Sequence, residues 1–220
     1  MTFKSRLLTT LAGVALCAGA SMTATTASAH NVLSVSEAPA GQLFPMKLNV
    51  NHGCKGAAVS AARLQIPDGI VDAKAADKVG WDVEYKMKDL ENPVMLHGRE
   101  VKEVIGEIVW TKSNGATVPS DGWATFEFRA TIPKDIGRVM HFKNITVCED
   151  GATDPYVDLP EAALDVNDPE FAKKAWAFMT ATPGPAPMVV IRQPEKGQYP
   201  WEWTPEQARG EAPSQEAMAR

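Results

Sequence analysis

A series of short segments in which apolar and polar residues alternate constrains the fold of this chain more than any other feature. Successive side chains of a β-strand point to opposite faces of a sheet, so this alternation predicts strands that bury one face. Turn-forming glycine, proline and aspartate residues separate the segments, which recur roughly every 15–20 residues, as in antiparallel sandwiches. The sequence therefore predicts an all-β antiparallel sandwich. The segments are residues 43–50, 62–66, 81–87, 106–110, 123–132, 139–142 and 144–148.

The same alternation predicts which side chains fill the core. The odd-numbered positions of segment 81–87 are expected to face inward, and Trp110 and Trp123 are expected to anchor the core. His141 stands between two apolar neighbours, so its side chain is expected to face solvent.

Beyond the predicted strands the pattern changes. Asp168 followed by a proline predicts the start of a short helix over 168–178. Residues 188–191 predict an edge strand. Residues 192–220 mix prolines with charged and small residues, and we expect a flexible tail.

Residues 1–29 have the organisation of a secretory signal peptide. Lys4 and Arg6 supply its charged start, an apolar stretch follows, and Ala27-Ser28-Ala29 is a small-residue cleavage site. No other apolar run approaches the ~20 residues that a membrane-spanning helix needs. We therefore expect an exported, periplasmic protein with no membrane span in its mature chain, which would begin at His30.

A histidine at a new N-terminus carries two neighbouring nitrogen donors. The α-amine has an ordinary pKa of about 8, so it can lose its proton near neutral pH and chelate a metal together with the imidazole. Such a pair suits Cu(II), which prefers nitrogen ligands in a tetragonal arrangement. The alternative is that His30 is incidental, because signal peptidase requires only the residues before it.

The cysteines give a second prediction. Cys17 falls in the leader, which leaves Cys54 and Cys148 as a pair in an exported protein. Disulfides form and persist outside the cytoplasm, so a Cys54–Cys148 bond is expected. A Cu(I) thiolate site is the alternative.

The remaining candidates are internal histidines. His52 lies two residues before Cys54 and is a candidate ligand, or a loop histidine bonded to the backbone. His97 lies in a predicted turn, and a purely structural role is the alternative there. Linear zinc-protease, CxxC and serine-hydrolase motifs are absent from the sequence. The formal net charge of −5 argues against nucleic acid and anionic membranes as partners.

Several short motifs, in order along the chain, resemble the YcnI-like family of exported copper-binding proteins, in its proteobacterial branch. The resemblance runs from about residue 30 to residue 160, and residues 181–187 match a last block. The motifs are His30-Asn31-Val32-Leu33, Asn51-His52-Gly53-Cys54, Arg63-Leu64-Gln65-Ile66-Pro67, Gly80-Trp81, His97-Gly98, Ile108-Val109-Trp110, Phe126-Glu127-Phe128-Arg129 and Val147-Cys148-Glu149-Asp150-Gly151.

The resemblance implies an immunoglobulin- or cupredoxin-like sandwich that binds Cu(II) through its N-terminal histidine. In this family a carboxylate and a tryptophan complete the single-histidine site. His30 matches the family pattern, but the loop that should carry the carboxylate has none, and His52 is its expected substitute. Tyr156 stands where the tryptophan is expected, as a nearby aromatic or axial oxygen. His97 is a further candidate for the same site.

The expected function is copper trafficking, storage or homeostasis by a protein that is not an enzyme. Its expected partners are the copper ion and a copper membrane transporter or another periplasmic copper chaperone. Domain limits of 1–29, 30–191 and 192–220 are predicted for the signal peptide, the copper-binding sandwich and the tail. Binding is expected to weaken below about pH 6, because the ligand nitrogens must be unprotonated. The alternatives are a histidine-brace oxidative copper enzyme and an interaction module that binds no metal.

Overall fold

The computed structural model describes residues 30–96, 98–116 and 118–195 of the 220-residue chain. The predicted signal peptide, His97 and residues 196–220 of the predicted tail lie outside the described residues. Within the described ranges no helix has the length and apolar character needed to cross a membrane.

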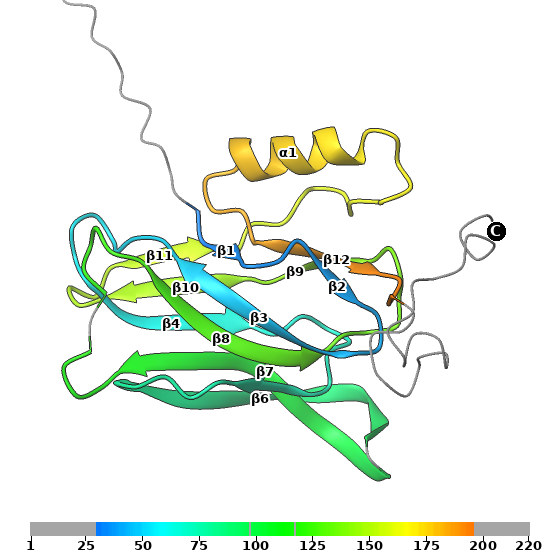
Figure 1. Ribbon diagram of the computed structural model, residues 1–220, viewed down its shortest axis with the longest axis horizontal. Coiled ribbons are helices and arrows are strands. Elements are labelled where there is room, and N and C mark those ends of the chain that lie inside the picture. The colour runs from blue at the N-terminus through cyan, green and yellow to red at the C-terminus, as the bar shows by residue number, and fades with distance from the viewer. Residues whose placement is uncertain (1–29, 97, 117, 196–220) are drawn as a thin grey trace, which may run out of the picture.

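Three sheets form most of the fold (Figure 1). The first has the order β1-β3-β8-β5 and consists of Val32–Leu33, Leu43–Val50, Ala124–Thr131 and Ala73–Ala75. The second has the order β11-β10-β4-β7-β6 and consists of Thr153–Tyr156, Asn144–Cys148, Val59–Gln65, Arg99–Lys112 and Trp81–Leu96. The third has the order β2-β12-β9 and consists of Glu37–Pro39, Met188–Arg192 and Val139–His141. The helix α1 spans Phe171–Ala181.

The core lies between the first two sheets, and the third sheet contributes Ala38, Met140, Val189 and Ile191 to it. On β3 and β8, buried side chains such as Leu48 and Phe126 alternate with exposed ones, as the period of two predicts. From the second sheet Trp110 reaches Phe126, with 5.4 Å between ring centroids, and Trp81 packs edge-on against the same ring at 4.8 Å. The predicted all-β sandwich is therefore confirmed.

Three predicted core positions are wrong, because local alternation does not reveal where the facing sheet ends. Trp123 is 68% exposed, since it precedes β8 and lies beyond the end of that strand. Tyr85 and Met87 are 40% and 53% exposed on β6, which is the edge strand of its sheet. The β6–β7 hairpin extends away from the rest of the sandwich (Figure 1).

The helix begins later than predicted. Asp168 is not its N-cap: the Asp168 carboxylate accepts a hydrogen bond from the Glu170 amide at 2.8 Å, and its carbonyl accepts one from the Phe171 amide at 2.8 Å. These bonds close a turn that precedes the helix, and Glu170 occupies the cap position without a side-chain bond.

The strand β12 is central and not an edge strand. It pairs in parallel with β2 and antiparallel with β9. The helix α1 lies along the same side of the molecule (Figure 1), and the His141 ring of β9 meets the Phe178 ring of α1 edge-on at 5.8 Å. The expectation that His141 faces solvent is therefore wrong, because a helix about 30 residues further along the sequence covers it.

Candidate metal centre

The pairing of β1 with β3 determines where His30 lies. Val32 is paired with Asn49, and the same antiparallel register continued by two residues brings His30 opposite Asn51. The Asn51 side-chain amide donates a hydrogen bond to the His30 carbonyl at 2.6 Å. His30 is therefore held beside the loop that contains His52.

A buried polar network holds the residue that follows His30. The Asn31 amide nitrogen donates to Asn144 Oδ1 and to Thr146 Oγ1, both at 2.9 Å, and its oxygen accepts from the Asn51 amide at 3.4 Å. Asn31, Asn144 and Thr146 are each 1% exposed. Buried polar groups that all have hydrogen-bond partners resist rearrangement, so this network fixes the path of the backbone that follows His30.

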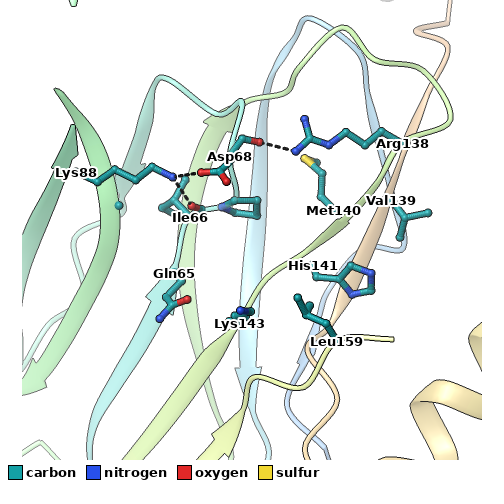
Figure 2. Close-up of a pocket in the computed structure, with 12 residues that line it drawn as sticks. Gln65, Ile66, Asp68, Lys88, Arg138, Val139, Met140, His141, Lys143 and Leu159 are labelled. Carbon is teal, nitrogen blue, oxygen red and sulfur yellow. Dashed lines mark hydrogen bonds and ion pairs between the residues drawn. The ribbon is translucent and has the colours of Figure 1, made fainter. Parts of the chain in front are cut away.

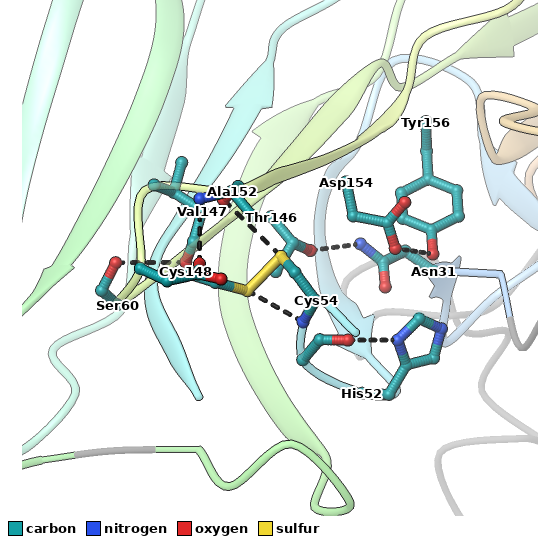
Figure 3. Close-up of a disulfide and its surroundings, with 12 residues drawn as sticks. Asn31, His52, Cys54, Ser60, Thr146, Val147, Cys148, Ala152, Asp154 and Tyr156 are labelled. Atoms are coloured by element: carbon teal, nitrogen blue, oxygen red, sulfur yellow. Dashed lines mark hydrogen bonds between the residues drawn. A yellow bond between two sulfur atoms is a disulfide. The ribbon is translucent and has the colours of Figure 1, made fainter. Parts of the chain in front are cut away.

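The loop that carries His52 is tied to the second sheet by the predicted disulfide. Cys54 and Cys148 are bonded across 94 residues of sequence, with 5.9 Å between their Cα atoms, which confirms that prediction (Figure 3). At Gly53 a Cβ atom would lie 2.0 Å from the Ala57 carbonyl oxygen, so only glycine fits there.

The backbone contact of His52 decides which of its nitrogens can bind a metal. His52 Nδ1 lies 2.7 Å from the Gly53 carbonyl oxygen (Figure 3). Because a carbonyl oxygen only accepts, Nδ1 carries the proton and donates this hydrogen bond. Nε2 then keeps its lone pair, which is how a backbone contact prepares a histidine ligand. The two roles considered for His52, backbone bonding and ligation, are therefore compatible.

Tyr156 lies against His30, with 6.1 Å between their ring centroids and an edge-on angle of 68°. The tyrosine is 2% exposed, and its hydroxyl donates a hydrogen bond to Asp154 Oδ2 at 2.7 Å (Figure 3). Burial raises the pKa of the Tyr156 hydroxyl, and the Asp154 carboxylate raises it further. The phenol therefore stays protonated at neutral pH, which favours the packing role over a phenolate oxygen ligand.

Asp154 is a candidate that the sequence prediction missed. The prediction looked for a carboxylate only in the loop of His52, whereas the structure brings one from β11 to the ring that faces His30. A signal was present: Asp154 and Tyr156 are two residues apart in a strand, so their side chains share a face.

The sequence model of the domain of unknown function DUF1775 matches residues 30–175. The chain belongs to the DUF1775 family. This family is also known as YcnI-like, so the resemblance seen in the sequence is confirmed at the level of the family. No curated protein matches the sequence.

A solved structure with an immunoglobulin-like fold confirms the fold of this DUF1775 domain. An uncharacterised protein from Nocardia farcinica, described as having an immunoglobulin-like fold, aligns with a TM-score of 0.50 and 17% identity. The alignment covers 74% of this chain and 99% of that protein. A cohesin module from a Clostridium perfringens family 33 glycoside hydrolase aligns with a TM-score of 0.39 and 13% identity, over 57% of this chain and 87% of the module.

The described side chains of the DUF1775 domain do not by themselves form a metal site. Among residues 30–96, 98–116 and 118–195, no three His, Cys, Asp or Glu side chains gather closely enough to hold a metal ion. An ion at His30 would therefore need another donor, such as an α-amine. The place of His97 is not described; its neighbours Leu96 and Arg99 are paired at the end of the β6–β7 hairpin.

A pocket of about 410 Å³ lies elsewhere on the domain, and Figure 2 shows its lining. Lys88 donates to Asp68 Oδ1 at 2.7 Å, and Arg138 donates to the Asp68 carbonyl at 2.8 Å. The hydrogen bond and charge of Lys88, together with the charge of Arg138, lower the pKa of the Asp68 carboxyl. Two of the cations in this pocket therefore hold the turn at Asp68.

Proposed function

We propose that the mature chain, beginning at His30, binds one Cu(II) ion and serves copper trafficking, storage or homeostasis in the periplasm. The observation that carries this proposal is the convergence of the His30 ring, the His52 loop and the Asp154–Tyr156 pair at one end of the sandwich. The resemblance to the proteobacterial YcnI-like proteins supports the same assignment.

Each group has a distinct role in the proposal. The α-amine and imidazole of His30 chelate the ion, and Nε2 of His52 offers a third nitrogen. The Asp154 carboxylate, which accepts the hydrogen bond of the Tyr156 hydroxyl, lies outside this ligand set, and its negative charge would offset part of the positive charge of the ion. The Tyr156 ring packs against the imidazole and holds its orientation. His97 remains a lower-ranked candidate.

We propose a carrier and not an enzyme, in line with the resemblance to copper-binding proteins, and the donors suit reversible binding. Amine and imidazole nitrogens lose their affinity for metal when they are protonated. The polar network around Asn31 holds His30 in place, so little ordering is needed when the ion binds. The proposed recipient is a copper membrane transporter or another periplasmic copper chaperone.

Calorimetric titration with Cu(II) tests the proposal. The protein beginning at His30 is compared with a form that carries Gly-Ser-Gly-Ser before His30, which moves the α-amine away from the imidazole. We expect one ion per mature chain and binding at least about 100-fold weaker in the extended form. His52→Ala and Asp154→Asn are each expected to weaken binding about tenfold, and Asp77→Asn, at an exposed position, serves as the matched control.

Each other outcome selects a different function. Equal binding by the mature and extended forms would move the site to internal residues. No binding by either form would favour an interaction module. Consumption of oxygen by the copper-loaded protein in the presence of a reductant would favour an oxidative enzyme.

A further inference from the structure

The strand β6 forms an open edge of the second sheet. It ends the order β11-β10-β4-β7-β6, so it pairs with β7 on one side, and no strand among the described residues pairs with its other side. Figure 1 shows β6 at the margin of the molecule. The backbone N–H and C=O groups of an unpaired edge can bond to a further strand. This edge is therefore a candidate surface for strand addition.

The hydrogen bonds to β7 show which backbone groups of β6 point outward. The Ser113 amide donates to the Gly80 carbonyl at 2.7 Å, so the backbone of Gly80 is directed toward β7. This direction alternates along an antiparallel strand, and the register with β7 is unbroken over residues 81–86. The N–H and C=O groups of Val83 and Tyr85 therefore point away from β7, toward any strand added at the edge.

The outer face of β6 carries two acidic side chains followed by two basic ones. Asp82, Glu84, Lys86 and Lys88 occupy alternate positions and so share this face. If a second copy of β6 pairs antiparallel about Tyr85, Asp82 lies opposite Lys88 of the second copy, and Glu84 lies opposite Lys86. Moving the axis by one residue in either direction places Glu84 or Lys86 opposite its own copy, where like charges repel. The charges thus match in one register.

Both lysines already bond to a carboxylate of their own chain. Lys86 pairs with Glu107 at 2.9 Å, and Lys88 pairs with Asp68 at 2.7 Å. An ammonium group has three N–H donors, so each lysine can also meet a second carboxylate. The existing ion pairs restrict the lysine side chains, which lowers the ordering cost of a further contact.

The inner face of β6 carries apolar side chains that the sandwich leaves partly uncovered. Val83 lies opposite Trp110 and Tyr85 lies opposite Ile108. Trp110 and Ile108 are both 0% exposed, so this face is on the core side of the sheet. Tyr85 and Met87 are nevertheless 40% and 53% exposed. In the register that matches the charges, Tyr85 meets its own copy and Met87 meets Val83, so pairing would cover these side chains.

We propose that two copies of this chain pair antiparallel through β6, with a twofold axis at Tyr85, and join their second sheets into one. Lysines on an exposed edge ordinarily discourage strand pairing. Here the acids of a second copy meet them, so the edge is selective for its own copy. One pair of strands buries less area than a permanent interface, and we expect a reversible dimer. The interface shares no residue with the proposed Cu(II) centre and does not depend on it.

Sedimentation velocity of the chain beginning at His30, from about 1 μM to about 0.5 mM, tests the proposal. The wild type should shift from monomer to dimer as its concentration rises. Glu84→Lys places like charges opposite each other twice in the dimer and should weaken dimerisation at least about tenfold. Glu91→Lys makes the same charge change at an exposed position of β6 outside the paired segment and serves as the matched control. Thermal unfolding checks that both variants fold.

Amide hydrogen exchange, followed by NMR, shows which strand edge is used. The amides of Val83 and Tyr85 should exchange more slowly as the concentration of the wild type rises, whereas those of Asp82 and Glu84, which bond to β7, should be slow at every concentration. The proposal is overturned if the wild type stays monomeric, or if Glu84→Lys dimerises no more weakly than Glu91→Lys. A dimer that leaves the exchange of Val83 and Tyr85 unchanged would also overturn it.

Discussion

Removal of the Cys54–Cys148 disulfide should destabilise the domain by an amount that follows from its topology. The bond closes a loop of 94 residues. In the chain-entropy model such a loop lowers the entropy of the unfolded state enough to contribute roughly 4–5 kcal/mol to stability. For a domain of this size each kcal/mol corresponds to about 2–4 °C, so the melting temperature should fall by roughly 8–20 °C.

Denaturation by urea measures this effect. The oxidised wild type, the reduced wild type and a variant with Cys54→Ala and Cys148→Ala are compared, with fluorescence of the buried Trp81 and Trp110 as the signal. The reduced protein and the variant should both unfold at lower urea. The variant should be no more stable than the reduced protein, since the Cys54 amide also donates to the Cys148 sulfur at 2.9 Å.

A small effect would refute the reasoning. If reduction and substitution each change the free energy of unfolding by less than about 1 kcal/mol, the bond does not constrain the unfolded chain as its loop length requires. The loop that carries His52 would then be held by its other contacts.

Three further predictions concern individual side chains. Burial raises the pKa of Glu107, but hydrogen bonds and charges from Arg63 and Lys86 outweigh the effect of burial and leave the pKa lowered. The stability that ionised Glu107 gives the folded domain is therefore present above the unfolded pKa of about 4.3 and is lost as pH falls through the lowered folded pKa. Glu107→Gln should cost about 1–2 kcal/mol at pH 7, and urea denaturation at pH 7 and pH 3 should show that the difference shrinks in acid. Tyr156→Phe should cost about 1 kcal/mol in thermal unfolding and leave the visible spectrum of the Cu(II) complex unchanged; loss of a phenolate band would contradict a packing role. Gly53→Ala should lower stability by about 1–3 kcal/mol and weaken Cu(II) binding in calorimetry, and wild-type values for both would show that the loop is not tightly constrained.

The strands that pair within the core were predictable because apolar and polar residues alternate along each of them, which indicates that one face is buried. The strand β3 spans 43–50, as the alternation indicated. The hairpin β6–β7 is longer than predicted because its outer part has no facing sheet to impose a pattern. The position of β12 between β2 and β9 was not predictable, because an apolar run does not identify its partners.

The residues of the candidate site were predictable only where neighbouring residues in the sequence point to them. His30 follows a predicted cleavage motif, and His52 lies two residues before a cysteine, so both could be found from their neighbours. Asp154 joins the site through the β10–β11 pairing and its hydrogen bond to Tyr156, which are properties of the fold. The contact of the His141 ring with Phe178 of α1 is likewise a property of the fold and could not be inferred from the strand of His141.

Electron paramagnetic resonance of the Cu(II)-loaded mature chain tests the central claim most directly, with all histidines and no other residues labelled with ¹⁵N. Because the α-amine belongs to His30, the account predicts ¹⁵N couplings from both amine and imidazole in the equatorial plane, and their loss when Gly-Ser-Gly-Ser precedes His30. Equatorial nitrogens that remain ¹⁴N, or identical spectra from the two forms, would contradict a copper centre at the mature N-terminus.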